Sequence, residues 1–146
     1  MKVTMLLCDF AEEVGGKLYI MGGGWTQLKR PRVATTMCLA VNLAIPSEEA
    51  EAVHKLKVEL VTSNDELVTQ EGSAVRVVGD IHAERDAATT ASGALPGDSN
   101  FVLRFDGLSL DPGLYSWRFE IDDNLMASVD FFVPDDQEPA GTDASP

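Results

Sequence analysis

The clearest strand in the chain reads Leu114-Tyr115-Ser116-Trp117-Arg118-Phe119-Glu120-Ile121. Large apolar side chains occupy every second position from Tyr115 to Ile121, and polar side chains fill the positions between them. Because successive side chains of a strand point to opposite faces of a sheet, we expect one face in a core and the other on the surface. The turn residues 122–124 then predict an antiparallel partner over 125–133.

Similar patterns recur along most of the chain and predict an all-β fold. Further strands are expected at 35–45, 54–62, 67–70, 74–81 and 101–105, with turn signals between them. About eight short antiparallel strands predict a β-sandwich of immunoglobulin-like or jelly-roll-like style, whose strand order stays open. Ser47 as an N-cap and the acids after it predict one short connector helix near 47–53.

The first hairpin is expected over residues 2–21. Gly15 and Gly16 supply the positive φ angles that a tight reversal needs. The run Met5–Cys8 before them is apolar without alternation. A strand of that kind is either covered on both faces within its own domain or lies in a subunit contact, and both readings stay open.

Composition bounds the rest of the molecule. The 146 residues fit one domain, which we place at 1–133, and the acidic residues 134–146 predict a disordered tail. The loop at 83–99 is poor in large apolar side chains and is expected to be mobile, although a functional loop would look the same. A formal net charge of −13 argues against nucleic-acid and membrane partners, which require clustered Lys or Arg.

We expect a cytoplasmic protein. No secretory signal is recognisable near the start, and no apolar run approaches the length of a membrane helix. Cys8 and Cys38 lie in apolar strand patterns and are expected to be buried free thiols, with a disulfide or a catalytic pair as the alternative.

The segment Gly22-Gly23-Gly24-Trp25 is the least regular part of the predicted strands. Three glycines favour a bend or a close backbone approach, and Trp25 after them can pack in the core or contact a partner. Arg30 and Arg32 follow in the only local cluster of positive charge. Because Trp and Arg are enriched at interaction hot spots, we take Gly22, Gly23, Gly24, Trp25, Arg30 and Arg32 as candidate interface residues.

No motif predicts a catalytic, cofactor-binding or metal-binding residue. The glycines lack the Lys-Ser or Lys-Thr pair and the helix of a phosphate loop, and Ser92 lacks the glycine frame of a nucleophile elbow. Asp98, Asp111 and Asp122 could meet at one end of a sandwich and hold calcium or a sugar, but we favour the interpretation that they are solvated turn residues.

Two segments resemble one uncharacterised family of short bacterial proteins. The first is Lys2-Val3-Thr4-Met5-Leu6-Leu7-Cys8-Asp9 followed by Gly16-Lys17-Leu18-Tyr19-Ile20-Met21-Gly22-Gly23-Gly24-Trp25, and the second is Leu108–Trp117 with the closing Phe131-Phe132-Val133. The resemblance implies a sandwich domain over most of 1–133 and assigns no catalytic residue. The resulting hypothesis is a non-enzymatic, homo-oligomeric module that acts through protein–protein contacts without a cofactor. The alternative is a small-ligand binder with its site in the end loops.

Overall fold

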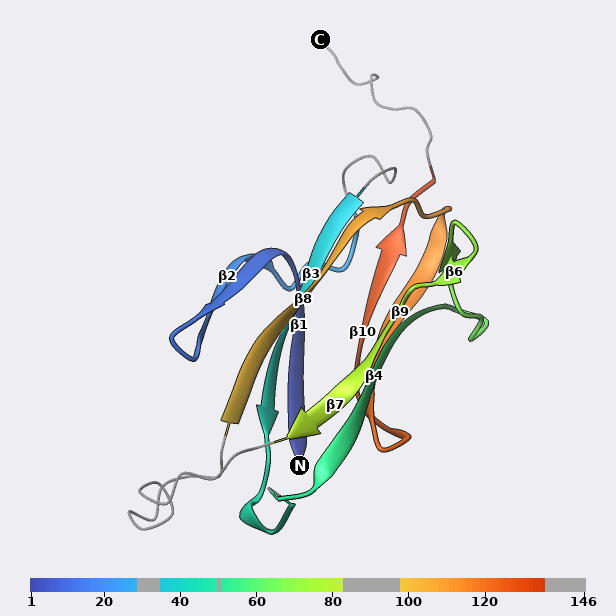
Figure 1. Cartoon of the computed structure of the whole chain (residues 1–146). Coiled ribbons are helices and arrows are strands. Elements are labelled where there is room, and N and C mark those ends of the chain that lie inside the picture. The colour runs from blue at the N-terminus through green and yellow to red at the C-terminus, as the bar shows by residue number, and fades with distance from the viewer. Residues whose placement is uncertain (29–34, 50, 83–97, 136–146) are drawn as a thin grey trace.

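In a computed structural model, the chain forms two four-stranded antiparallel sheets packed against each other (Figure 1). The structure describes residues 1–28, 35–49, 51–82 and 98–135. The strands are β1 (Lys2–Val14), β2 (Lys17–Gly23), β3 (Thr35–Ala44), β4 (Val53–Thr62), β5 (Thr69–Gln70), β6 (Ser73–Ala74), β7 (Arg76–His82), β8 (Asp98–Leu108), β9 (Gly113–Ile121) and β10 (Asn124–Val133). One sheet has the order β2-β1-β3-β8 and the other the order β10-β9-β4-β7. The predicted β-sandwich is confirmed.

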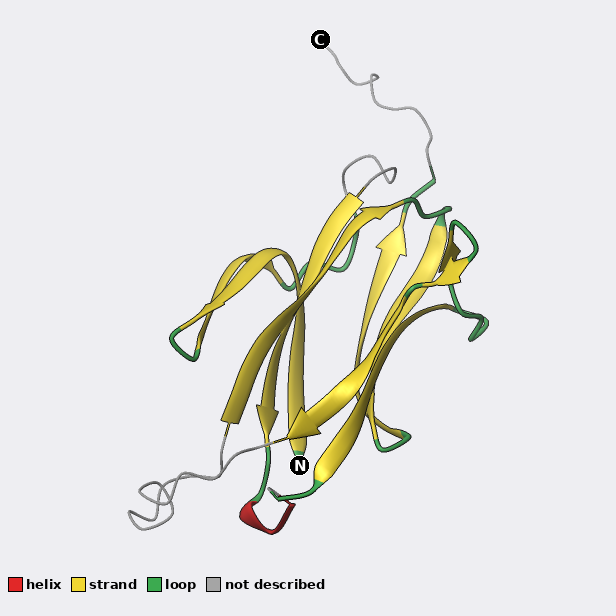
Figure 2. Cartoon of the chain, viewed as in Figure 1, coloured by secondary structure: helices red, strands yellow, loops and turns green. Residues whose placement is uncertain are grey.

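Two details of the strand prediction change. The described residues form ten strands rather than about eight. The expected strand at 67–70 is shortened to β5, which pairs with β6, and the expected strand at 74–81 is divided into β6 and β7. The connector is a single 3₁₀ turn, η1 (Ser47–Glu49), drawn in red in Figure 2. The amide of Glu49 donates to the carbonyl of Pro46 and that of Ala52 to the carbonyl of Glu49, so both bonds span three residues and no α-helix forms.

The strand with the clearest alternation, β9, lies in the interior of its sheet. β9 runs between β10 and β4, and the side chains of Trp117 and Phe119 are fully buried between the sheets. The Trp117 ring lies 4.2 Å from that of Phe105, and its Nε1 points at the sulfur of Met37 at 3.4 Å. These contacts join the two sheets, and the predicted inward face of residues 115–121 is confirmed.

The β1–β2 hairpin adds a partial third layer. β1 pairs with β3 through residues 2–8 and with β2 through residues 8–14, so its second half leaves the sandwich together with β2. We call residues 9–23 the wing. In Figure 1 the wing extends from β1 and β3 on the side away from β4, β9 and β10. Its tip is held to β8, where the Asn100 side-chain amide donates to the Gly16 carbonyl at 2.7 Å.

A small second core lies beneath the wing. It contains Cys8, Ala11, Cys38 and Ala40, with Leu18 and Val102 packed against them. Leu7 and Cys8, although consecutive, are therefore both buried, one in the main core and one under the wing. Coverage within the same chain explains most of the apolar run of β1, but Leu6 is 37% exposed.

The turn at the wing tip is as the sequence predicts. Val14 pairs with Lys17 across a two-residue loop, and Gly15 and Gly16 have φ of 60° and 81°. Positive φ at both positions is the signature of a type I′ turn, whose twist matches that of a hairpin. This turn fixes the register of the whole wing.

Some predictions fall outside the described residues. These include Arg30, Arg32, most of the loop at 83–99 and residues 136–146 of the predicted tail. None of the described segments forms an apolar helix of membrane-spanning length.

Candidate interaction surface

The three predicted glycines form the base of the wing. Gly22 and Gly24 have φ of 63° and 83°, which favours glycine at both. A Cβ at Gly22 would overlap the Asp9 carboxylate, and one at Gly23 would lie 2.8 Å from a Leu6 methyl carbon. The predicted bend is therefore present, and the space that larger side chains would need is already filled by the wing.

Trp25 packs against the main core. Its ring meets that of Phe131 edge-on, with 5.7 Å between centroids and 74° between planes. The Nε1 atom is buried, and no atom of the described chain accepts a hydrogen bond from it. The side chain is only half-buried, so a role in an interface with Arg30 and Arg32 stays a prediction.

The outward face of the wing carries four exposed apolar side chains beside the charged Glu12 and Lys17. The register pairs Phe10 with Met21 and Val14 with Lys17, so alternate residues of β1 and β2 share the face that points away from the sandwich. Phe10, Val14, Tyr19 and Met21 are 41%, 51%, 55% and 67% exposed. We call these four residues the wing patch.

Sequence reasoning missed the wing patch, although a signal was available. The glycines and the basic loop were the expected interface, and residues 18–21 carry only an ordinary strand pattern. Once the Gly15-Gly16 turn is recognised as a two-residue hairpin loop, the pairing of 14 with 17 fixes which residues share a face. Nothing in the sequence shows which of the two faces the sandwich covers.

A second polar cluster lies where β4 begins. The Nδ1 of His54 is 2.7 Å from a carboxylate oxygen of Asp122, and its Nε2 is 3.0 Å from the Glu49 carbonyl. The other Asp122 oxygen accepts the Lys55 backbone N–H at 2.9 Å, and the Glu49 carboxylate lies 3.8 Å from the amino group of Met1. The cluster ties η1, the start of β4 and the β9–β10 turn together.

Hydrogen bonding sets the charges in this cluster. The bond to the Asp122 carboxylate, helped by the one to the Glu49 carbonyl, raises the pKa of His54 above its ordinary value of 6.5. The bonds from His54 and from the Lys55 amide lower the pKa of Asp122 below 3.8. Both ring nitrogens of His54 face oxygens that only accept, and this geometry favours the charged form of the imidazole.

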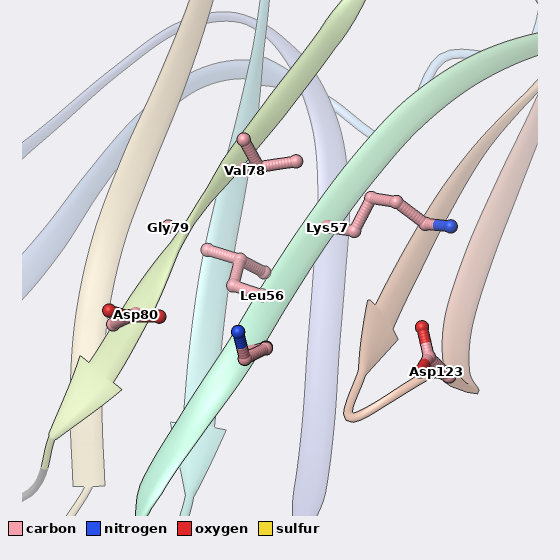
Figure 3. Close-up of a pocket in the computed structure, with 7 residues that line it drawn as sticks. Leu56, Lys57, Val78, Gly79, Asp80 and Asp123 are labelled. Carbon is pink, nitrogen blue, oxygen red and sulfur yellow. The ribbon is translucent and has the colours of Figure 1, made fainter.

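The concave feature in Figure 3 is a depression beside β4 and β7. Its volume is about 350 Å³, and it is lined by Lys55, Leu56, Lys57, Val78, Gly79, Asp80 and Asp123. Asp80 lies on one side of β4 and Asp123, in the β9–β10 turn, on the other. The Lys57 ammonium is already 3.6 Å from Glu120 and 3.8 Å from Glu59.

The three end-loop carboxylates of the ligand hypothesis do not meet in one place. Asp111 precedes β9 and Asp122 follows it, so the nine residues of that strand separate them at opposite ends of the sandwich. Asp98 begins β8 in the other sheet. Among the described residues, no three His, Cys, Asp or Glu side chains are grouped in a way that could hold a metal ion.

The two cysteines are free thiols, as predicted. Cys8 and Cys38 are cross-strand partners on β1 and β3, and both are fully buried. Burial, with a further contribution from Cys38, raises the pKa of the Cys8 thiol to about 11. The closed structure therefore keeps Cys8 in its unreactive protonated form.

Comparison with known proteins adds a family but no activity. No curated protein matches the chain. A family model described as a family of unknown function, DUF6941, matches residues 3–134. This confirms the resemblance to an uncharacterised family, whereas the role of the Lys2–Trp25 pattern as its signature stays a prediction. Since the match spans nearly the whole sandwich, the chain belongs to DUF6941, a family of unknown function.

Proposed function

We propose that this domain is a non-enzymatic assembly module that acts through protein–protein contacts in the cytoplasm, with a second copy of itself as its partner. The wing patch is the observation that carries the proposal. Isolated exposed apolar side chains are common on protein surfaces, but a group of them on one projecting element is typical of an interaction site. Here four of them share one face of a single hairpin.

The way the wing is built supports this reading. Its inner face already has its own small core and a hydrogen bond to β8, so the outer side chains are not needed to hold the hairpin in place. Tyr19 and Phe10 are aromatic and Met21 is flexible, and these residue types are enriched in the cores of protein interfaces.

The decisive experiment compares two double variants of the full chain. Tyr19→Ser with Met21→Ser removes the centre of the wing patch. We expect the dissociation constant of the oligomer to rise about thirtyfold, which corresponds to about 2 kcal/mol of lost apolar burial. Light scattering and sedimentation equilibrium at micromolar concentration measure it, and circular dichroism checks that the melting temperature is retained.

A matched control is available on the other sheet. Val78 and Leu125 are 66% and 58% exposed, close to the values of Met21 and Tyr19, but lie on β7 and β10. Val78→Ser with Leu125→Ser should leave association unchanged. A wild-type protein that is strictly monomeric at all salt concentrations, or equal weakening by both double variants, would overturn the proposal.

Small-ligand binding is the second candidate function, and the depression in Figure 3 favours it. A volume of about 350 Å³ lies within the range of small-molecule sites. Its two lysines and two carboxylates suit a ligand rich in hydroxyl groups, such as a carbohydrate. A thermal-shift screen with sugars and calcium tests this candidate. A shift that Asp123→Asn removes would support it, and the absence of any shift across the panel would count against it.

A further inference from the structure

The four edges of the two sheets are protected to different degrees. β7 carries Arg76 and Asp80, and β8 carries Asp98, Arg104 and Asp106. β10 has a bulge between Leu125 and Ala127, and its Phe132 exchanges backbone hydrogen bonds with the segment after β2. Charges and bulges of this kind prevent a sheet edge from pairing with another chain. Each of these three edges therefore has a device against further pairing.

The fourth edge, β2, lacks such protection. Its only charged residue is Lys17 at its first position, and Leu18–Met21 is continuously apolar. In the part of the chain that the structure describes, no strand pairs with β2 on the side away from β1. β2 is also the outermost labelled strand on that side of the molecule (Figure 1). An apolar edge that is not covered is a template for adding a strand.

The wing turn shows which backbone groups are available on this edge. In a two-residue hairpin the closing pair, here Val14 with Lys17, is hydrogen-bonded, and bonded and non-bonded pairs then alternate. Lys17, Tyr19 and Met21 consequently direct their N–H and C=O groups toward β1. Leu18 and Ile20 direct theirs to the outer edge. Gly22, with φ of 63°, ends the regular segment.

Two copies of this edge complement each other. In an antiparallel pairing centred on Tyr19, Leu18 of one copy lies opposite Ile20 of the other, and both strands present their outward N–H and C=O groups there. The two symmetric Leu18–Ile20 pairs would form four backbone hydrogen bonds. An antiparallel strand pair with this register has a two-fold axis, as most homodimers do.

The side chains fit the same register. On the outward side, Tyr19 of one copy would lie opposite Tyr19 of the other, and Met21 would lie opposite Lys17 of the other. The two wing patches would then join into one. Leu18 and Ile20 would pack against each other on the inner side. No acid lies on β2, and Lys17 of each copy would approach the β1 strand of the other, which carries Glu12 on the same face. The contact therefore places opposite charges near each other at both ends.

We propose that β2 pairs antiparallel with β2 of a second copy, centred on Tyr19, and joins the two β2-β1-β3-β8 sheets into one continuous eight-stranded sheet. This inference rests on the proposed self-assembly and specifies its geometry. The strand pairing can be wrong and the assembly function still be right, because two wing patches could also meet face to face without strand pairing.

Disulfide trapping tests the register. The Lys17→Cys and Met21→Cys variants of the full chain are prepared separately and then mixed under mild oxidation. Lys17 and Met21 would be directly opposed across the two-fold axis in a non-hydrogen-bonded pair, with Cα atoms about 4.5 Å apart, which a disulfide accepts. We expect the mixture to give several-fold more hetero-disulfide dimer than either variant gives of homodimer. Cys8 and Cys38 are buried and do not compete.

Further variants separate the possible outcomes. Val14→Cys, on the same wing face and 51% exposed, should not form a disulfide with Met21→Cys. Met21→Cys could instead form a disulfide with Tyr19→Cys and not with Lys17→Cys. That result would overturn the Tyr19-centred register. A dimer by light scattering without selective trapping would overturn strand pairing and leave the assembly function standing. A strict monomer would overturn both.

Discussion

The contribution of a single residue, His54, to the stability of the fold depends on pH. Its pKa is raised in the folded protein, so its contribution to stability is complete below 6.5 and is lost as the pH rises through the raised value. The pKa of Asp122 is lowered, so its contribution is complete above 3.8 and is lost as the pH falls through the lowered value. The pair therefore stabilises the fold most between pH 3.8 and pH 6.5.

We expect the melting temperature of His54→Gln to lie furthest below that of the wild type in this window. The difference should shrink as the pH rises above 6.5, because the wild type then loses the charge that Gln never had. Thermal unfolding across a pH series measures it, and the same substitution at the exposed His82 on β7 is the control. A difference independent of pH would show that folding does not shift the pKa of His54.

At the scale of elements, the wing is a hairpin whose two faces have different roles. Its inner face covers Cys8 and Cys38, and its outer face carries the wing patch. The tip is held by Asn100, which donates to the Gly16 carbonyl at 2.7 Å and accepts from the Asn42 side chain at 2.7 Å. Any opening of the wing would expose the two thiols, so they report on its motion.

We expect Asn100→Ala to loosen the wing without unfolding the sandwich. The variant loses two hydrogen bonds, of which only the bond to the Gly16 carbonyl holds the wing. Loss of that bond costs about 1 kcal/mol, which raises the open population about fivefold. The rate at which Cys8 and Cys38 react with a thiol reagent should rise by the same factor in native buffer. Asn64→Ala, in an exposed turn remote from the wing, is the matched control. An unchanged rate would show that packing alone holds the tip.

At the scale of the whole molecule, net charge should oppose the proposed assembly. Each copy carries a formal net charge of −13, and few positive groups offset it near the contact. Ion pairs exposed to solvent, such as those expected of Lys17, contribute at most about 1 kcal/mol. Long-range repulsion between two acidic copies should therefore dominate the electrostatics of association.

We expect added salt to strengthen the oligomer. The screening length falls from about 10 Å at 0.1 M ionic strength to about 3 Å at 1 M, which weakens repulsion between like charges. The dissociation constant from sedimentation equilibrium should drop several-fold between these conditions. The Tyr19→Ser, Met21→Ser double variant should associate about thirtyfold more weakly than the wild type at both salt concentrations. Weaker association at high salt would mean that local ion pairs hold the copies together.

The sequence by itself determined the parts of the fold that depend on neighbouring residues. Alternation over 114–121 identified the central strand and its buried face because side-chain direction on a strand has a period of two. Gly15 and Gly16 identified the first turn because positive φ is inexpensive only for glycine. The buried thiols and the family resemblance followed from residues that lie close together along the chain.

Only the tertiary structure decided which faces are covered and which distant residues meet. The apolar run of β1 looked equally suited to a subunit contact until the wing was seen to fold over it. Asp111 and Asp122 looked like neighbours until β9 placed them at opposite ends, and His54 meets Asp122 from 68 positions away. The physical reason is that strand order and sheet packing arise from contacts between segments far apart in sequence, which local patterns do not encode.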